Sequence, residues 1–198
     1  SVKTEPRAST HVGRFAPSPT GDLHFGSVVT AVASYISIKQ KKGKWILRID
    51  DLDSNRSKKG AADCIKHTLE GLGLFWDGEA VYQTNRVEAY KEAVDKLETI
   101  GKTYNCKCNR KELTPPYLGT CREKKITDAE PHSKRVIVET GMISFTDGTF
   151  GNTNKNLKES IGDFIILRKD QIHAYPLTVT VDDYLDSVTE VVRGCDLL

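Results

Sequence analysis

A turn rich in helix-breaking residues separates a strand from a helix near the start of the chain. Val12–Ala16 has the composition of a short strand, and the turn Pro17–Asp22 (PSPTGD) follows it directly. A helix is predicted over about 26–42, because apolar residues recur there every four positions and Gly43 follows. A strand, a tight turn and a helix in this order are typical of the first unit of a doubly wound sheet.

The next segments repeat this alternation. Trp45–Ile49 is mostly apolar, as expected for a buried parallel strand. A charged loop then leads to a second helix, whose apolar face consists of Ala61, Ile65, Leu69 and Leu72. The order strand, helix, strand, helix predicts an α/β fold with a doubly wound, Rossmann-type sheet.

The later segments give a mixed pattern. A helix is predicted over 85–100, with Asn85 and Glu88 spaced as in a capping box. Strands are predicted over 135–139 and 163–168, and a hairpin over 144–150. Residues 174–181 (AYPLTVTV) end in an alternation of Thr and Val, which favours a strand by propensity.

Composition excludes some classes of protein. Hydrophobic residues make up 38% and charged residues 28% of the 198 residues, which argues against wholesale disorder. No run of about 18 apolar residues is present, so no membrane span is predicted. The first ten residues are polar, which does not suit a secretory signal, and a cytoplasmic location is expected.

Basic residues are clustered although the net charge is only +2. A single cluster is usually a solvated face, but several make a phosphate-binding surface plausible. The clusters are Lys39–Lys44, Arg56–Lys59, Lys107–Lys111 and Arg122–Lys125.

Three of the five cysteines, Cys106, Cys108 and Cys121, fall close together in the sequence. An odd number of cysteines does not suit a secreted disulfide scaffold, so the cluster indicates a metal, with free surface thiols as the alternative. Cys64 and Cys195 have apolar neighbours and are predicted to be buried thiols.

The first turn has the features of an anion site. Gly21 and Gly26 allow tight turns and close approach of a ligand, and the helix start presents free N–H groups with His24 beside them. On the local pattern alone, the segment could equally be only a turn in which His24 caps the helix.

A resemblance to a known family extends over nearly the whole chain after residue 11. Arg14–Ser27 (RFAPSPTGDLHFGS) resembles the first signature of the glutamyl-tRNA synthetases, which are class I enzymes. Arg48–Asp53 (RIDDLD), Leu74–Gly78, Tyr82–Arg86 and Val188–Leu197 resemble further motifs of that family in the same order. Shared order over this length is highly specific.

The family has two branches with these motifs. Members of one charge the 3′ end of their tRNA, and members of the other attach glutamate to queuosine in the anticodon of tRNA(Asp). Leu23–Ser27, Ala33–Tyr35 and Trp76–Glu79 are similar to the second branch, as is the short cysteine module. The resemblance therefore favours the glutamyl-queuosine tRNA(Asp) synthetases.

The resemblance implies roles for individual residues. Catalytic positions at the ATP phosphates are His24, Gly26 and Ser27, where class I synthetases have His-Ile-Gly-His. Glutamate-binding positions are Arg14, Phe15, Ala16, Pro17, Ser18, Asp50, Tyr175 and Arg193. Arg14 and Arg193 would hold the side-chain carboxylate, and Asp50 departs from the glutamate that is usual there. The same resemblance makes Ala174–Ser187 a helix.

The resemblance also implies a metal and a domain organisation. Cys106, Cys108, Tyr117 and Cys121 would hold one structural Zn²⁺. The first half of the Rossmann domain is expected over 11–84, and an inserted α+β acceptor-type subdomain over 85–160, with its zinc knuckle at 104–122. Residues 161–198 are expected to return to the Rossmann sheet, which would be left incomplete.

The expected reaction uses glutamate and ATP with Mg²⁺ to form glutamyl-adenylate, and then transfers glutamate to tRNA(Asp). A monomer without membrane contact is expected. Two alternatives stay open: part of a canonical glutamyl-tRNA synthetase, and a non-catalytic tRNA-binding module derived from a synthetase. A Lys-Met-Ser-Lys-Ser-like second signature does not occur in the sequence, so we expect a C-terminally truncated chain that does not form adenylate at a useful rate.

Overall fold

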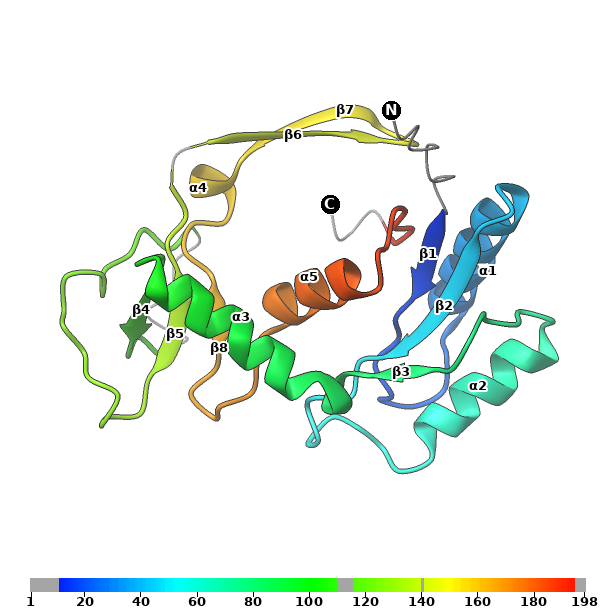
Figure 1. Cartoon of the computed structure of the whole chain (residues 1–198), viewed down its shortest axis with the longest axis horizontal. Helices are drawn as coiled ribbons and strands as arrows, with labels where there is room; N and C mark the ends of the chain where they lie inside the picture. The colour runs from blue at the N-terminus through cyan, green and yellow to red at the C-terminus, as the bar shows by residue number, and fades with distance from the viewer. Residues whose placement is uncertain (1–10, 110–115, 140, 195–198) are drawn as a thin grey trace, which may run out of the picture. The chain divides into compact units, whose positions relative to one another are not determined.

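The computed structural model describes residues 11–109, 116–139 and 141–194. The chain forms two compact units (Figure 1). The first consists of Ser1–Val87 with Asp182–Leu198, and the second of Glu88–Val181. No helix in the described ranges has the length and apolar character needed to cross a membrane.

A parallel sheet forms the centre of the first unit. Strand β1 (Val12–Phe15) pairs with β2 (Lys44–Ile49), which pairs in turn with β3 (Val81–Tyr82). On the other side of β1, Glu190 forms a parallel bridge with Gly13. Strand β1 therefore lies between β2 on one side and a segment near the C-terminal end of the described chain on the other. This is the arrangement of a doubly wound sheet, and the predicted α/β class is confirmed.

Helices α1 (Phe25–Gln40) and α2 (Ala61–Gly71) belong to this unit. Figure 1 shows α1 packed beside β1 and β2. Gly13 permits the close approach of α1, because a Cβ atom there would lie only 2.2 Å from Ile38 Cγ1. The buried core between these elements includes Phe15, Ala31, Ile38, Trp45, Leu47, Ile49, Ile65, Leu69 and Leu74.

The structure differs from the predicted helices at Leu72 and Asn85. Leu72 follows the end of α2 and is 50% exposed, so it does not belong to the buried face. Asn85 lies in a short 3₁₀ helix (Gln83–Arg86) before α3 (Val87–Thr99), so it does not cap α3. Cys64 is exposed on α2, and the prediction that this thiol is buried is wrong.

An antiparallel sheet organises the second unit. Strand β5 (Ser133–Val136) pairs with both β4 (Thr103–Cys106) and β8 (Ile165–Leu167). Residues 161–198 were expected to return together to the Rossmann sheet, but β8, which lies in this range, pairs with β5 instead. Strand β8 is held in the second unit by its hydrogen bonds to β5, and the return occurs near residue 190.

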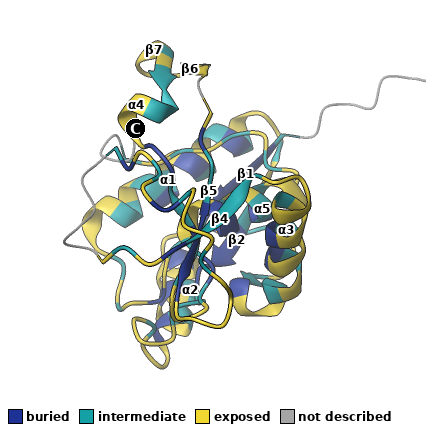
Figure 2. Cartoon of the chain, turned by 90° about the vertical axis from the view of Figure 1, so that its left-hand side faces the viewer, coloured by how far each residue is buried: buried dark blue, intermediate teal, exposed yellow. Residues whose placement is uncertain are grey.

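A hairpin extends from this sheet. Strands β6 (Met142–Asp147) and β7 (Gly151–Asn156) pair along their length, and the short helix α4 (Leu157–Ser160) follows. Asp147 Oδ1 accepts hydrogen bonds from the Thr149 and Phe150 N–H groups and closes the turn. The predicted hairpin is confirmed, although its second strand begins later than expected. The described residues of β6 and β7 are exposed or intermediate (Figure 2).

Helix α5 (Tyr175–Leu185) forms where propensity alone favours a strand. Pro176 lies in the first turn, where the missing N–H group has no helical partner to lose. The Thr178 and Thr180 hydroxyls donate to the carbonyls of Tyr175 and Pro176, which satisfies them within the helix. Burial of Leu177 then outweighs the weak local preference, and the helix expected from the resemblance is confirmed.

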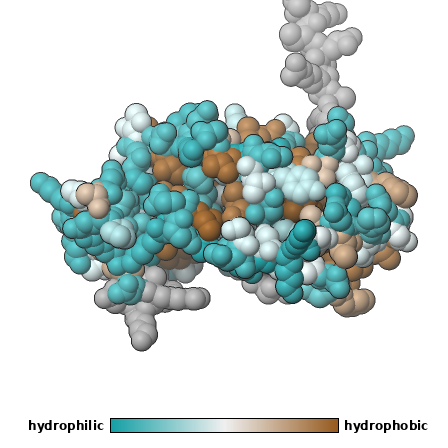
Figure 3. Space-filling model, turned by 90° about the horizontal axis from the view of Figure 1, so that it is seen from below, coloured by the Kyte–Doolittle hydropathy of each residue, from teal (hydrophilic) through white to brown (hydrophobic). Residues whose placement is uncertain are grey.

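The surface visible in Figure 3 is mostly hydrophilic, with hydrophobic residues in small separate patches. Several apolar side chains are nevertheless well exposed, among them Met142 and Phe150 of the hairpin segment. Single exposed apolar residues are ordinary on protein surfaces, so they do not by themselves define a site.

Candidate active site

The carboxyl end of β1 is where a doubly wound sheet places its ligands, because the strand order reverses there. The loop after β1 is tied to its neighbours by backbone hydrogen bonds. The Asp50 N–H donates to the Pro17 carbonyl at 3.0 Å, and the Lys58 N–H donates to the Pro19 carbonyl at 2.8 Å. Therefore the loop and the end of β2 form one continuous edge.

The loop residues with predicted glutamate contacts differ in accessibility. The Phe15 ring is buried and stacks on Trp45, with ring centroids 6.3 Å apart, so this side chain belongs to the core. Ala16 and Pro17 are half-buried, and Ser18 is exposed. For Phe15, the backbone rather than the side chain could face a ligand.

His24 begins α1 and caps it. Its Nδ1 accepts a hydrogen bond from the Ser27 N–H at 3.3 Å, and its Nε2 lies 3.0 Å from the Ser27 hydroxyl. His24 and Gly26 are exposed, and Ser27 is half-buried. The three predicted catalytic residues are thus brought together at a helix start, where backbone N–H groups and the helix dipole favour an anion.

A buried network of charged side chains lies beneath this edge. The Arg14 guanidinium binds Asp183 with two hydrogen bonds of 3.1 Å. Arg48 donates from Nη1 to Asp183 at 2.8 Å and from Nε to Asp50 at 2.9 Å. Arg48 is fully buried, and Asp182, also fully buried, lies 3.4 Å from its Nε.

Asp50 is only partly satisfied in this network. Its Oδ1 is bound by Arg48, whereas its buried Oδ2 has no hydrogen-bond partner among the described residues. Burial raises the pKa of Asp50 to about 6, although the attraction of Arg48 opposes the shift. The free oxygen fits a donor such as an ammonium group, which would replace the missing bond.

Two predicted residues lie outside this network. Arg193 is exposed and follows the segment that pairs beside β1, and no ion pair to it occurs within the described ranges. Tyr175 belongs to the second unit, where it begins α5 with 53% of its surface exposed. Their contacts with glutamate stay predictions.

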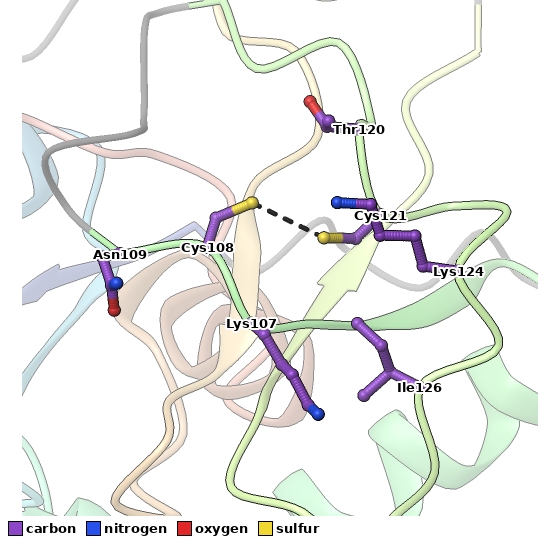
Figure 4. A pocket seen from close by; sticks show the side chains of 7 residues that line it. All are labelled: Lys107, Cys108, Asn109, Thr120, Cys121, Lys124 and Ile126. Carbon is purple, nitrogen blue, oxygen red and sulfur yellow. Dashed lines mark hydrogen bonds between the residues drawn. The ribbon is translucent and has the colours of Figure 1, made fainter.

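The second unit brings together the predicted metal ligands. The sulfur atoms of Cys106, Cys108 and Cys121 all lie within 4.8 Å of one another. The Tyr117 hydroxyl lies 3.5 Å from the Cys106 sulfur and 3.3 Å from the Cys108 sulfur. In Figure 4 the thiols of Cys108 and Cys121 point toward each other. The four side chains therefore converge on one point.

Neighbouring groups tune this cluster. Although burial opposes the shift, hydrogen bonding to Tyr117 lowers the pKa of the Cys121 thiol to about 7. The Arg135 guanidinium lies 4.0 Å from the centre of the Tyr117 ring, and the Cys121 N–H donates to the Tyr117 hydroxyl. The thiolate form that a metal ligand requires is thereby favoured at Cys121.

A cavity of about 580 Å³ opens beside Cys108 and Cys121. Its other lining residues are Lys107, Asn109, Thr120, Lys124 and Ile126 (Figure 4). The positive charge expected for this module is partly neutralised, because Lys107 pairs with Glu130 and Arg122 pairs with buried Asp163. Arg110 and Lys111 lie outside the described residues.

The sequence did not identify the acidic side of the network. Asp182 and Asp183 directly follow a run of Thr and Val residues, which gives no sign of their contact with Arg14 and Arg48. A buried arginine within the apolar strand β2 was a usable signal, because a buried guanidinium requires carboxylate partners.

The sequence matches the family model of the catalytic domain of class I tRNA synthetases for glutamate and glutamine. The matches cover residues 11–139 and 117–198. The chain therefore belongs to this family, and its Rossmann-type sheet with the helix start after β1 agrees with that assignment.

Several curated relatives place it more narrowly. A protein of Dechloromonas aromatica named "Glutamyl-Q tRNA(Asp) synthetase" is 42% identical over 96% of this chain and 67% of its own length. Proteins of the same name from Neisseria gonorrhoeae and Pseudomonas putida are both 44% identical, over 95% and 96% of this chain. The resemblance to the glutamyl-Q tRNA(Asp) synthetases is thus confirmed.

Solved structures support the fold. A glutamate tRNA ligase of Elizabethkingia meningosepticum, in complex with its amino acid, matches with a TM-score of 0.82 and 25% identity. The match covers 94% of this chain and 44% of that structure. The glutamate-tRNA synthetase of Elizabethkingia anophelis matches with a TM-score of 0.83. The chain spans about two thirds of the curated relatives and less than half of these structures.

Proposed function

We propose that the protein carrying this chain activates glutamate with ATP and transfers it to queuosine in tRNA(Asp). The observation that carries the proposal is the meeting of a helix start, Arg14 and Asp50 at the carboxyl edge of the parallel sheet. The names of the curated relatives support the choice of amino acid and acceptor.

The first step is attack of the glutamate α-carboxylate on the α-phosphate of ATP, with release of pyrophosphate. A carboxylate is already nucleophilic at pH 7, so the step needs positioning and neutralisation of charge rather than a base. In this proposal the N–H groups at the start of α1, together with His24 and Ser27, bind the phosphates of ATP, which enters with Mg²⁺.

The amino acid carries one ammonium group and two carboxylates. Arg14 and Arg193 would hold the side-chain carboxylate, for which the planar guanidinium is well shaped. The free Oδ2 of Asp50 supports a role in binding the ammonium group, with Ser18 and Tyr175. Asp50 is shorter than the usual glutamate by one carbon–carbon bond, about 1.5 Å.

We also propose that the cysteine cluster binds one structural zinc ion. Tetrahedral zinc with Zn–S bonds of about 2.3 Å holds its sulfur ligands about 3.8 Å apart. The 3.5 Å separation of the Cys108 and Cys121 sulfur atoms lies near that value, and the Tyr117 hydroxyl, 3.5 Å from the Cys106 sulfur, would be the fourth ligand. The ion would hold together a loop that has few apolar residues of its own.

Protein purified without chelator should contain about one zinc per chain, because three thiols converge with a fourth donor. Cys108→Ser should lose most of it, whereas Cys64→Ser, which removes an exposed thiol in the other unit, should retain it. Elemental analysis by mass spectrometry measures both. A folded wild-type protein without metal would refute the site.

Transfer of labelled glutamate tests the reaction. With the full-length protein, label should appear on tRNA from queuosine-competent cells and be absent from tRNA without queuosine. Label at the 3′ end of tRNA(Glu) would instead identify a canonical glutamyl-tRNA synthetase. Absence of glutamate-dependent pyrophosphate exchange would favour the non-catalytic tRNA-binding module.

Arg193→Ala tests the proposed contact between Arg193 and the side-chain carboxylate of glutamate. Loss of one charge-assisted pair costs about 1.5–3 kcal/mol, so KM for glutamate should rise roughly 10- to 150-fold. Arg56→Ala, which removes an exposed arginine elsewhere in the first unit, should leave KM unchanged. An unchanged KM in Arg193→Ala would contradict the assigned pocket.

A further inference from the structure

Four charged side chains in the first unit form an alternating chain. Arg14 binds Asp183, Asp183 binds Arg48, and Arg48 binds Asp50, through hydrogen bonds of 2.8–3.1 Å. The two ends, Arg14 and Asp50, are the residues proposed for the opposite ends of the amino acid. The middle pair, Asp183 and Arg48, has no assigned role in that reaction.

Asp183 is the branch point of this chain. Its Oδ1 accepts from both Arg14 Nε and Arg48 Nη1, and its Oδ2 accepts from Arg14 Nη2. Three charge-assisted bonds to two arginines fix the planes of both guanidinium groups. Because each arginine has several rotatable bonds, such a shared carboxylate determines where the unbound N–H groups point.

The network is incomplete on one side. Asp50 Oδ2 and Arg48 Nη2 are buried, and neither has a hydrogen-bond partner in the described part of the chain. A buried acceptor and a buried donor without partners are unfavourable, at about 1–3 kcal/mol each. An amino acid supplies the matching pair, since its ammonium group donates and its carboxylates accept.

We propose that Asp183 is a positioning residue that fixes the separation between the Arg14 and Asp50 anchors, and thereby selects amino acids by length. This inference rests on the proposed function. Arg48 transmits the constraint, because one guanidinium binds both Asp183 and Asp50. Without Asp183, Arg14 can swing, and glutamate loses its advantage over aspartate, which is shorter by one methylene.

The test compares Asp183→Asn with Asp186→Asn in the full-length protein. Asp186 also binds an arginine through two hydrogen bonds, to Arg86. Among the described residues, Arg86 reaches Arg48 only through Asp182, so the control removes the same chemistry without a direct contact to Arg14, Arg48 or Asp50. Without substrate, NMR measures hydrogen exchange of the Nε–H groups of Arg14 and Arg48. With substrate, pyrophosphate exchange gives kcat and KM for glutamate and aspartate.

Asp183→Asn should accelerate Nε–H exchange of Arg14 and reduce the preference for glutamate over aspartate about 10- to 100-fold, mainly through KM. Asp186→Asn should change neither quantity. Equal effects of both variants would indicate a merely structural role and overturn the proposal, as would an unchanged preference in Asp183→Asn.

Two further outcomes are decided in the same experiment. If Asp183→Asn does not fold, Asp183→Glu keeps the charge but moves the carboxylate by about 1.5 Å, and an unchanged preference there overturns the proposal. If the wild-type protein activates no glutamate, the proposed function fails, and the exchange rates of the arginines alone decide whether Asp183 positions them.

Discussion

Arg48→Met should reduce the free energy of unfolding of the first unit by about 3–5 kcal/mol at pH 7. Arg48 is fully buried and lies within ion-pair distance of Asp50, Asp182 and Asp183. Methionine fills a similar volume but leaves three carboxylates without their shared cation. Urea denaturation followed by the fluorescence of Trp45 and Trp76, both in the first unit, measures the loss, and Arg56→Met serves as the exposed control.

The free energy of unfolding that Arg48→Met loses should be smaller at lower pH. The pKa of Asp50 in the folded protein, about 6, lies above the usual carboxyl value, so its contribution to stability is present at low pH and is lost as pH rises through 6. Without Arg48 that pKa rises further, and protonation relieves the repulsion at pH 5. A loss below 1 kcal/mol, or one that does not depend on pH, would contradict this account of the network.

Asp163→Asn should destabilise the second unit by about 3–5 kcal/mol at neutral pH. Asp163 is 1% exposed and accepts two hydrogen bonds from Arg122, one from the Tyr104 hydroxyl and one from the Val138 N–H. An amide cannot accept all four bonds, and Arg122 loses its counter-charge. Far-ultraviolet circular dichroism during urea denaturation measures the change.

Here the pH dependence has the opposite sign. Burial alone would raise the pKa of Asp163, but the bonds from Arg122 and Tyr104 lower it below the usual value. Its stabilising effect is therefore present above the ordinary carboxyl pKa and is lost as pH falls. The difference in stability between wild type and Asp163→Asn should therefore shrink as pH falls below the ordinary carboxyl pKa. Asp170→Asn, which breaks an exposed pair with Arg168, should cost at most about 1 kcal/mol, and an equal cost would refute the role of burial.

The sequence was most informative where local pattern and tertiary structure agree. Strand β1 and the helices α1 and α2 were predicted because apolar spacing coincides with the buried core formed around Trp45 and Leu69. By contrast, β5 buries Ser133, Lys134 and Arg135, so its burial depends on distant partners such as Glu98 and Asp163. The periodicity of apolar residues along the sequence does not indicate partners that are distant in the chain.

The candidate site could be predicted from the sequence only in part, because some of its residues are placed by distant contacts. His24 and Gly26 follow the turn after a strand and lie at the start of a helix, so chain order alone places them at the ligand edge. Asp183 could not be found in this way, because its contacts with Arg14 and Arg48 join residues separated by 169 and 135 positions. The cysteine cluster was readable from spacing, since its members lie within a single short module.

These separations also bear on how the protein is made. The ribosome adds about 5–20 residues per second, so Arg14 and Arg48 emerge roughly 7 to 34 seconds before Asp183. During that interval two guanidinium groups lack the carboxylate that later holds them, while the second unit, Glu88–Val181, is synthesised between them and their partner. The proposed amino-acid pocket therefore cannot form before Asp183 has been synthesised, however early the segment that carries Arg14 and Arg48 emerges.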